Sequence, residues 1–81
     1  MKKSKRRYIV RASYGKNYDW GQAMKVYWEF ADKASCTESD DSNSGRADKY
    51  FFKHRKPAME CFQSLERRRV VKSVSITKEV V

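Results

Sequence analysis

The sequence predicts a small two-layer α+β domain in which an antiparallel sheet carries one or two helices on one face. Three observations lead to this prediction: a length of 81 residues, apolar residues that alternate at period two near both ends of the chain, and helical periodicity in two segments between them. A chain this short builds one core. We therefore expect a single domain over residues 7–81, preceded by a flexible basic arm over residues 1–6.

Three segments have the composition or the alternation of strands. They are residues 7–14, 49–55 and 71–80. The first places four residues on one face: Tyr8, Val10, Ala12 and Tyr14. The last alternates most clearly, with one apolar row and one row of mostly hydroxyl side chains, which predicts a strand with one face on the core.

Residues 20–34 fit two patterns. On a helix, the apolar residues from Trp20 to Ala34 fill one arc, and Asp19 with Gln22 has the spacing of a capping box. Residues 24–30 also alternate as a strand would. We favour the helix because its pattern holds over the longer stretch. If residues 24–32 formed a strand, the domain would be a ββ(β)αβ meander with one helix.

The remaining segments complete the order strand, helix, loop, strand, helix, strand. Residues 35–48 are rich in Ser, Asp and Asn without periodicity, so we expect a long polar loop, in which a short edge strand near Cys36 could be hidden. A second helix is predicted to open at Pro57, bury Ala58, Cys61, Phe62 and Leu65, and end in Arg67-Arg68-Arg69. This order favours a split βαβ, ferredoxin-like arrangement.

Charge is unevenly distributed along the chain. The net charge is +9, but residues 1–16 carry seven basic and no acidic side chains, whereas residues 17–48 carry three basic and seven acidic ones. Residues 49–81 are basic again, with nine basic and three acidic side chains. Both ends are therefore basic around an acidic middle.

The residues offer little from which to build a metal or catalytic site. Cys36 and Cys61 are far apart in the sequence and His54 is the single histidine, whereas structural zinc needs four ligands, usually in close pairs. Residues 40–45 partly mimic a calcium loop, but the twelfth position of that loop is Phe51 rather than Glu. No motif surrounds a nucleophile or a base. We expect no metal, no cofactor and no enzymatic activity.

The expected cellular location rests on three absences in the sequence. No segment approaches the roughly 20 apolar residues of a membrane span, and Arg11 interrupts the apolar run that a secretion signal would need. Two cysteines are too few for a disulfide framework. We expect a cytoplasmic protein.

Nucleic acid is the partner that the basic clusters favour, because cations that track a phosphate backbone bind it irrespective of sequence. Aromatic residues near these clusters would allow stacking with bases if the open face of the sheet displays them. The predicted contact residues are Lys2, Lys3, Lys5, Arg6, Arg7, Lys53, Arg55, Lys56, Arg67, Arg68, Arg69 and Tyr50.

A protein partner is the alternative hypothesis. The acidic stretch 38–48, together with Glu29 and Asp32, gives the chain a two-signed surface, which suits docking onto a charged protein. In this interpretation the domain is an interaction module, an inhibitor or an adaptor, of the kind that phages and mobile elements encode, docking through its acidic loop and its aromatic surface.

Overall fold

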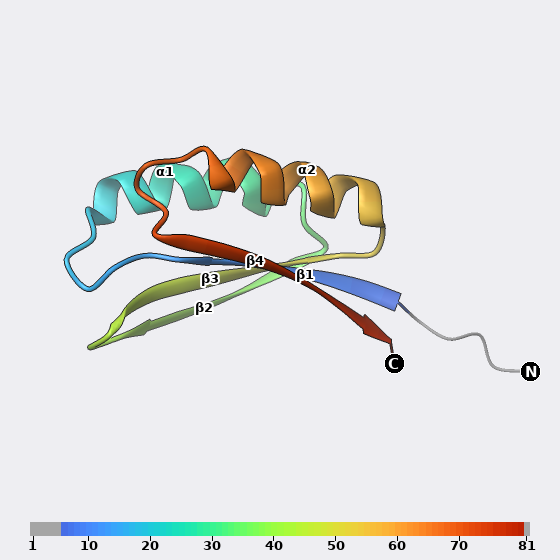
Figure 1. Ribbon diagram of the computed structural model, residues 1–81, viewed down its shortest axis with the longest axis horizontal. Coiled ribbons are helices and arrows are strands. Elements are labelled where there is room, and N and C mark those ends of the chain that lie inside the picture. Colours follow the sequence, from blue (N-terminus) through green and yellow to red (C-terminus); the bar gives the residue numbers. More distant parts are fainter. Residues whose placement is uncertain (1–5, 81) are drawn as a thin grey trace, which may run out of the picture.

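A computed structural model describes residues 6–80 of the chain, as a four-stranded sheet covered on one face by two helices (Figure 1). The elements follow the order β1 (Arg6–Ser13), α1 (Trp20–Ala31), β2 (Cys36–Ser42), β3 (Gly45–Phe52), α2 (Arg55–Glu66) and β4 (Ser73–Val80). The strand order across the sheet is β2-β3-β1-β4, and all neighbours are antiparallel. This small α+β architecture and its split βαβ order confirm the predicted fold class.

The register of the strands decides which side chains reach the core. Val10 lies opposite Tyr50 on β3 and Ile76 on β4, so these three side chains point to the same, helix-covered face. Val10 and Tyr50 are completely buried there. The helices contribute Ala23, Val26 and Phe30 from α1, and Ala58, Cys61 and Leu65 from α2. One hydrophobic cluster therefore joins both helices to the sheet.

The helical interpretation of the ambiguous segment is confirmed, because α1 runs from Trp20 to Ala31. The carboxylate of Asp19 accepts a hydrogen bond from the backbone N–H of Gln22 at 3.1 Å, as the capping pattern predicted. Buried side chains at positions 23, 26 and 30 have helical spacing, and a strand would have placed them on both faces. The meander alternative is therefore wrong.

The predicted long loop over residues 35–48 is also wrong, because most of it forms a β-hairpin. β2 occupies Cys36–Ser42, and β3 begins at Gly45, four residues before the predicted strand start at 49. Asn43 and Ser44 form the two-residue turn, and Gly45 follows it with φ +125°. The edge strand that the sequence left open near Cys36 is therefore present, as β2. Its full length was not predicted because an exposed edge strand needs no apolar row, and its side chains are almost all polar.

The second helix begins at Arg55 rather than at Pro57, so Pro57 lies within the first turn, where the missing N–H costs no hydrogen bond. The helix packs mainly on β1 and β4 and also contacts β3, the strand on which α1 packs. Figure 1 shows the two helices side by side above the sheet, running in opposite directions.

The two cysteines have contrasting environments, which leads to a testable prediction. Cys36 is exposed on β2, whereas Cys61 is buried under α2, and desolvation by burial raises the pKa of its thiol to about 12. Since the thiolate is the reactive form, native protein at mildly alkaline pH should take up one equivalent of iodoacetamide, at Cys36, and a second only after denaturation. Peptide mass mapping checks the site. Rapid alkylation of Cys61 in the folded protein would contradict the placement of this thiol in the core.

Candidate nucleic-acid interface

Two groups of the predicted basic contact residues lie at opposite ends of α2. Lys53, Arg55 and Lys56 are exposed at its beginning, and Arg67 to Arg69 follow its end. Twelve helical residues span about 18 Å. One helix therefore holds the two clusters about this far apart.

The start of β1 lies at the same end of the sheet as the beginning of α2, because of the pairing of the strands. Tyr8 on β1 lies opposite Phe52, the last residue of β3, so the chain that enters β1 and the chain that leaves β3 share one end of the sheet. Figure 1 shows the start of β1 and the end of β4 at this same end. Lys2, Lys3 and Lys5 lie outside the described residues, and Arg6 is the first residue of β1.

Lys78 joins this end of the molecule, although the sequence pattern did not single it out. It lies opposite Tyr8 on β4, and its side chain lines a shallow hollow together with Arg55, Tyr8, Met59 and Ile76. The signal was present in the sequence, because Lys78 interrupts the apolar row formed by Val74, Ile76 and Val80. A lysine in such a row marks the point where the strand leaves the core.

The beginning of α2 adds a positive potential of its own. The N-cap residue His54 makes no side-chain capping hydrogen bond, and no acidic residue lies in the first turn. The N–H groups of that turn therefore have no side-chain acceptor from the cap, and the positive end of the helix dipole reinforces the neighbouring cations. We call the exposed residues at this end, Lys53, Arg55, Lys56 and Lys78, the basic end.

Arg7 and Arg68 are held by other residues of the domain. Arg7 donates from Nε to Oε1 of Glu79 at 2.6 Å and lies over the ring of Phe51 at 4.9 Å. Arg68 pairs with Glu29 of α1 and lies over the ring of Phe30. Arg68 thus links the two helices, so its removal is expected to weaken packing as well as charge, unlike removal of Arg67 or Arg69.

The prediction that Tyr50 contacts nucleic acid is wrong for this fold, because Tyr50 is 0% exposed. Its ring lies between the sheet and α1, 6.1 Å from the rings of both Tyr27 and Phe30. Burial raises the pKa of its phenol far above the usual range. A base could stack on Tyr50 only after the core had opened.

The open face of the sheet does not supply an aromatic platform in place of Tyr50. The residues of β1 and β3 that point there include Arg7, Ile9, Arg11, Lys49 and Phe51. Phe51 is only 8% exposed, and Arg7 lies over its ring. The described part of this face therefore presents charged side chains rather than exposed rings, and Arg7 and Lys49 are paired there with Glu79 and Glu38. This arrangement disfavours stacking of bases on the sheet.

The strand order places the acidic and the basic segments of the sequence on different sides of the molecule. Segment 19–42, which contains α1 and the edge strand β2, holds six acidic and two basic side chains, a net charge of −4. Segment 53–80, which contains α2 and the opposite edge strand β4, holds eight basic and three acidic side chains, a net charge of +5. Because β2 and β4 are the two edges of the sheet, the acidic and the basic segments lie on opposite sides.

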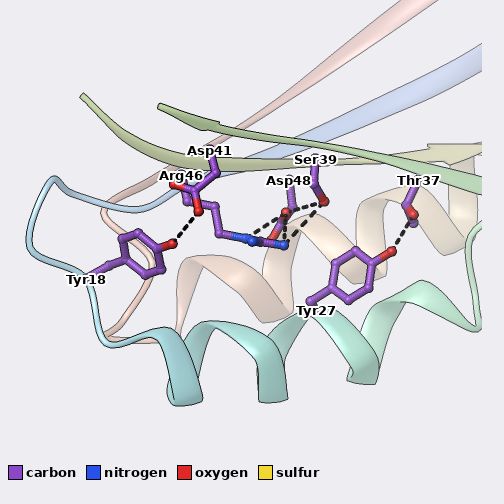
Figure 2. A network of polar contacts seen from close by, with 7 residues as sticks. All are labelled: Tyr18, Tyr27, Thr37, Ser39, Asp41, Arg46 and Asp48. Carbon is purple, nitrogen blue, oxygen red and sulfur yellow. Dashed lines mark hydrogen bonds and ion pairs between the residues drawn. The ribbon is translucent and has the colours of Figure 1, made fainter. Parts of the chain in front are cut away.

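A row of polar contacts holds α1 and its preceding loop against the hairpin on the acidic side (Figure 2). Tyr18 donates to Asp41 at 2.9 Å, and this hydrogen bond raises the pKa of the phenol. Asp48 is completely buried, where it accepts a hydrogen bond from Ser39 at 2.7 Å and pairs with Arg46 at 3.0 Å. These contacts replace the apolar packing that β2 lacks.

Comparison with known proteins does not assign a function to the chain. No protein-family model matches it, and no curated protein matches it at a significant level. Between residues 6 and 80, no group of three or more His, Cys, Asp or Glu side chains is placed to hold a metal ion. Neither helix of this part of the chain is long and apolar enough to cross a membrane.

Proposed function

We propose that this domain binds nucleic acid through the phosphate backbone, using the basic end and the cations at the other end of α2, without catalysis and without reading the base sequence. The single observation that carries the proposal is the placement of the basic clusters on one side of the sheet, with the acidic segment on the other. A cytoplasmic setting agrees with such a ligand.

Physical reasons support a backbone-directed mode. None of the described salt bridges involves Lys53, Arg55, Lys56 or Lys78. Binding of phosphates would therefore break no ion pair at the basic end. The favourable free energy of binding comes from the release of counterions from the nucleic acid, so the affinity should fall steeply as the salt concentration rises. The buried position of Tyr50 supports contacts with phosphates over contacts with bases.

Paired charge-removal variants test this proposal by fluorescence anisotropy with labelled single-stranded and duplex oligonucleotides of several sequences. We expect Arg55→Ala/Lys56→Ala to weaken binding to all sequences alike. The slope of log affinity against log salt concentration should become less steep by about one for each phosphate that is no longer neutralised. Arg67→Ala/Arg69→Ala should act in the same way at the other end of α2. Arg68 is left in place because it links the helices.

The matched control is Lys25→Ala/Lys33→Ala, which removes the same charge from two exposed positions on the acidic side. Its salt slope should equal that of the unmodified protein. Equal weakening by both pairs would mean that net charge alone drives binding, and the proposed surface would be abandoned. Undetectable binding at low salt would overturn the function itself.

A further inference from the structure

An exposed apolar stripe on α1 is not used by the proposed nucleic-acid interface. Trp20 and Trp28 are 62% and 64% exposed, and Met24 lies between them at intermediate exposure. Positions 20, 24 and 28 are four residues apart, so the three side chains follow one another along the same line of the helix. We call these three residues the α1 stripe. Trp is usually well buried, so two exposed indoles on one helix indicate a binding surface.

The stripe is attached to a rigid support. The ring of Tyr27 meets Trp28 edge-on at 5.3 Å, and its hydroxyl is 2.7 Å from Oγ1 of Thr37 on β2. Figure 2 shows Tyr27 crossing from α1 to this edge strand, close to the buried Arg46–Asp48 pair. A ring held in this way loses little conformational freedom when a partner covers it, which is the property of an interface anchor.

Acidic side chains flank the stripe. Asp19 precedes α1, Asp32 follows it, and Asp41 lies on the helix-facing side of β2, where it accepts a hydrogen bond from Tyr18. None of the four described salt bridges involves any of these carboxylates. The segment that carries the stripe has a net charge of −4, so a partner that combines an apolar face with basic flanks is complementary to it.

The same charge disfavours two other occupants. Nucleic acid would stack on the indoles only by bringing its phosphates against carboxylates. A second copy of the chain, paired symmetrically through the α1 stripe, would place one net-negative segment against another. Two indoles and one Met also bury far less than the roughly 800 Å² per partner of a standard interface, so they suit a short segment better than a whole subunit.

We propose that the α1 stripe is a docking site for a basic amphipathic helix of a protein partner, with apolar side chains against Trp20, Met24 and Trp28 and Lys or Arg beside the acidic flanks. This site lies on α1, over the acidic side of the sheet, whereas the basic end lies at the beginning of α2. The domain would thus bind a protein on one side and nucleic acid on the other, and the protein site stands independently of the proposed nucleic-acid interface.

The two Trp residues supply the probe, because they are the only ones in the chain and both lie on the stripe. We would titrate the full chain with a Trp-free synthetic peptide of about 18 residues in which Leu and Lys repeat with helical spacing. We expect a saturable blue shift of the Trp emission. A peptide of the same pattern with Glu in place of Lys should give no shift. No shift with the Lys peptide, or equal shifts with both, would overturn the proposal.

Variants separate docking from general electrostatic attraction. Trp28→Ala should weaken binding of the Lys peptide at least about tenfold, which is the size of an anchor effect, and calorimetry is the readout because one fluorophore is removed. The fold should survive because this side chain is mostly exposed. Gln22→Ala, at an exposed position on the polar arc of α1, is the matched control and should bind normally. Equal affinities for these two variants would contradict the site.

Two measurements exclude the other occupants and keep this proposal separate from the proposed function. Sedimentation velocity should give the same mass for the unmodified chain and for Trp28→Ala. If the unmodified chain were a dimer and Trp28→Ala a monomer, the α1 stripe would be a self-association surface and the peptide proposal would be wrong. Trp28→Ala should also bind oligonucleotides as the unmodified chain does, whereas Arg55→Ala/Lys56→Ala should bind the Lys peptide normally. If an oligonucleotide competed with the peptide for the stripe, the proposal would be wrong.

Discussion

Replacement of Asp48 by Ala is expected to destabilise the domain by about 3–5 kcal/mol, the cost of leaving a buried charge without its partner. Asp48 is 0% exposed, and the side chain of Arg46 that pairs with it is only 11% exposed. The carboxylate also accepts the hydrogen bond from Ser39. Urea unfolding followed by far-UV circular dichroism measures the loss; Trp fluorescence would report poorly, because both indoles are already exposed.

The comparison that isolates the buried pair uses Asp41→Ala. Asp41 is exposed and makes one hydrogen bond, to Tyr18, so its removal should cost about 1 kcal/mol or less. The double variant Arg46→Ala/Asp48→Ala should recover part of the loss of the single Asp48 variant, because no unpaired charge remains. If the Asp48 and Asp41 variants lost equal stability, the buried Arg46–Asp48 pair would not have the large effect expected of it.

Gly45→Ala is the second substitution with a large expected effect. Gly45 has φ +125°, a conformation that costs other residues about 1–3 kcal/mol. An added Cβ would also lie 2.4 Å from the carbonyl oxygen of Tyr14 and 3.1 Å from the backbone of Gly15. Because these neighbours are backbone atoms of the connection after β1, they cannot rotate away. The free energy of unfolding should therefore fall by more than the conformational cost alone.

Gly21→Ala is the matched control for the same chemical change. Gly21 is exposed in the first turn of α1, and its added Cβ would meet only the side chain of Asp19, at 3.4 Å. Ala is a better helix former than Gly, so this variant should gain up to about 1 kcal/mol. If the free energy of unfolding falls for Gly45→Ala and rises for Gly21→Ala in the same urea series, the hairpin turn imposes its conformation on Gly45. A neutral Gly45 variant would contradict it.

Periodicity in the sequence was enough to predict the elements that contact the core. α1 was recognisable because its apolar residues keep helical spacing across the whole segment, and β4 because its apolar row alternates. The pattern failed where a strand makes few apolar contacts. β2 has one half-buried position, Thr37, and a polar sequence gives no periodicity from which such an edge strand can be predicted.

The candidate site was predictable in composition but not in arrangement. Lys49-Tyr50-Phe51-Phe52 contains three rings in a row, so alternation could not tell which of them faces the core; the pairing of Val10 with Tyr50 settles that question. Likewise, the sequence showed an acidic middle, but its position on one side of the molecule follows from the strand order. Lys78 belongs to the basic end because β4 pairs with β1, which lies some seventy residues earlier in the sequence.

The polar character of β2 also has a consequence for how this protein behaves at high concentration. An edge strand offers unpaired backbone groups to which another chain can add, and an apolar edge invites aggregation into extended sheets. β2 carries Glu38, Asp40 and Asp41 along that edge, and its exposed side chains would repel the same edge of a neighbouring molecule. The residues that made this strand difficult to recognise thus protect a marginally sized domain from polymerising through its own sheet.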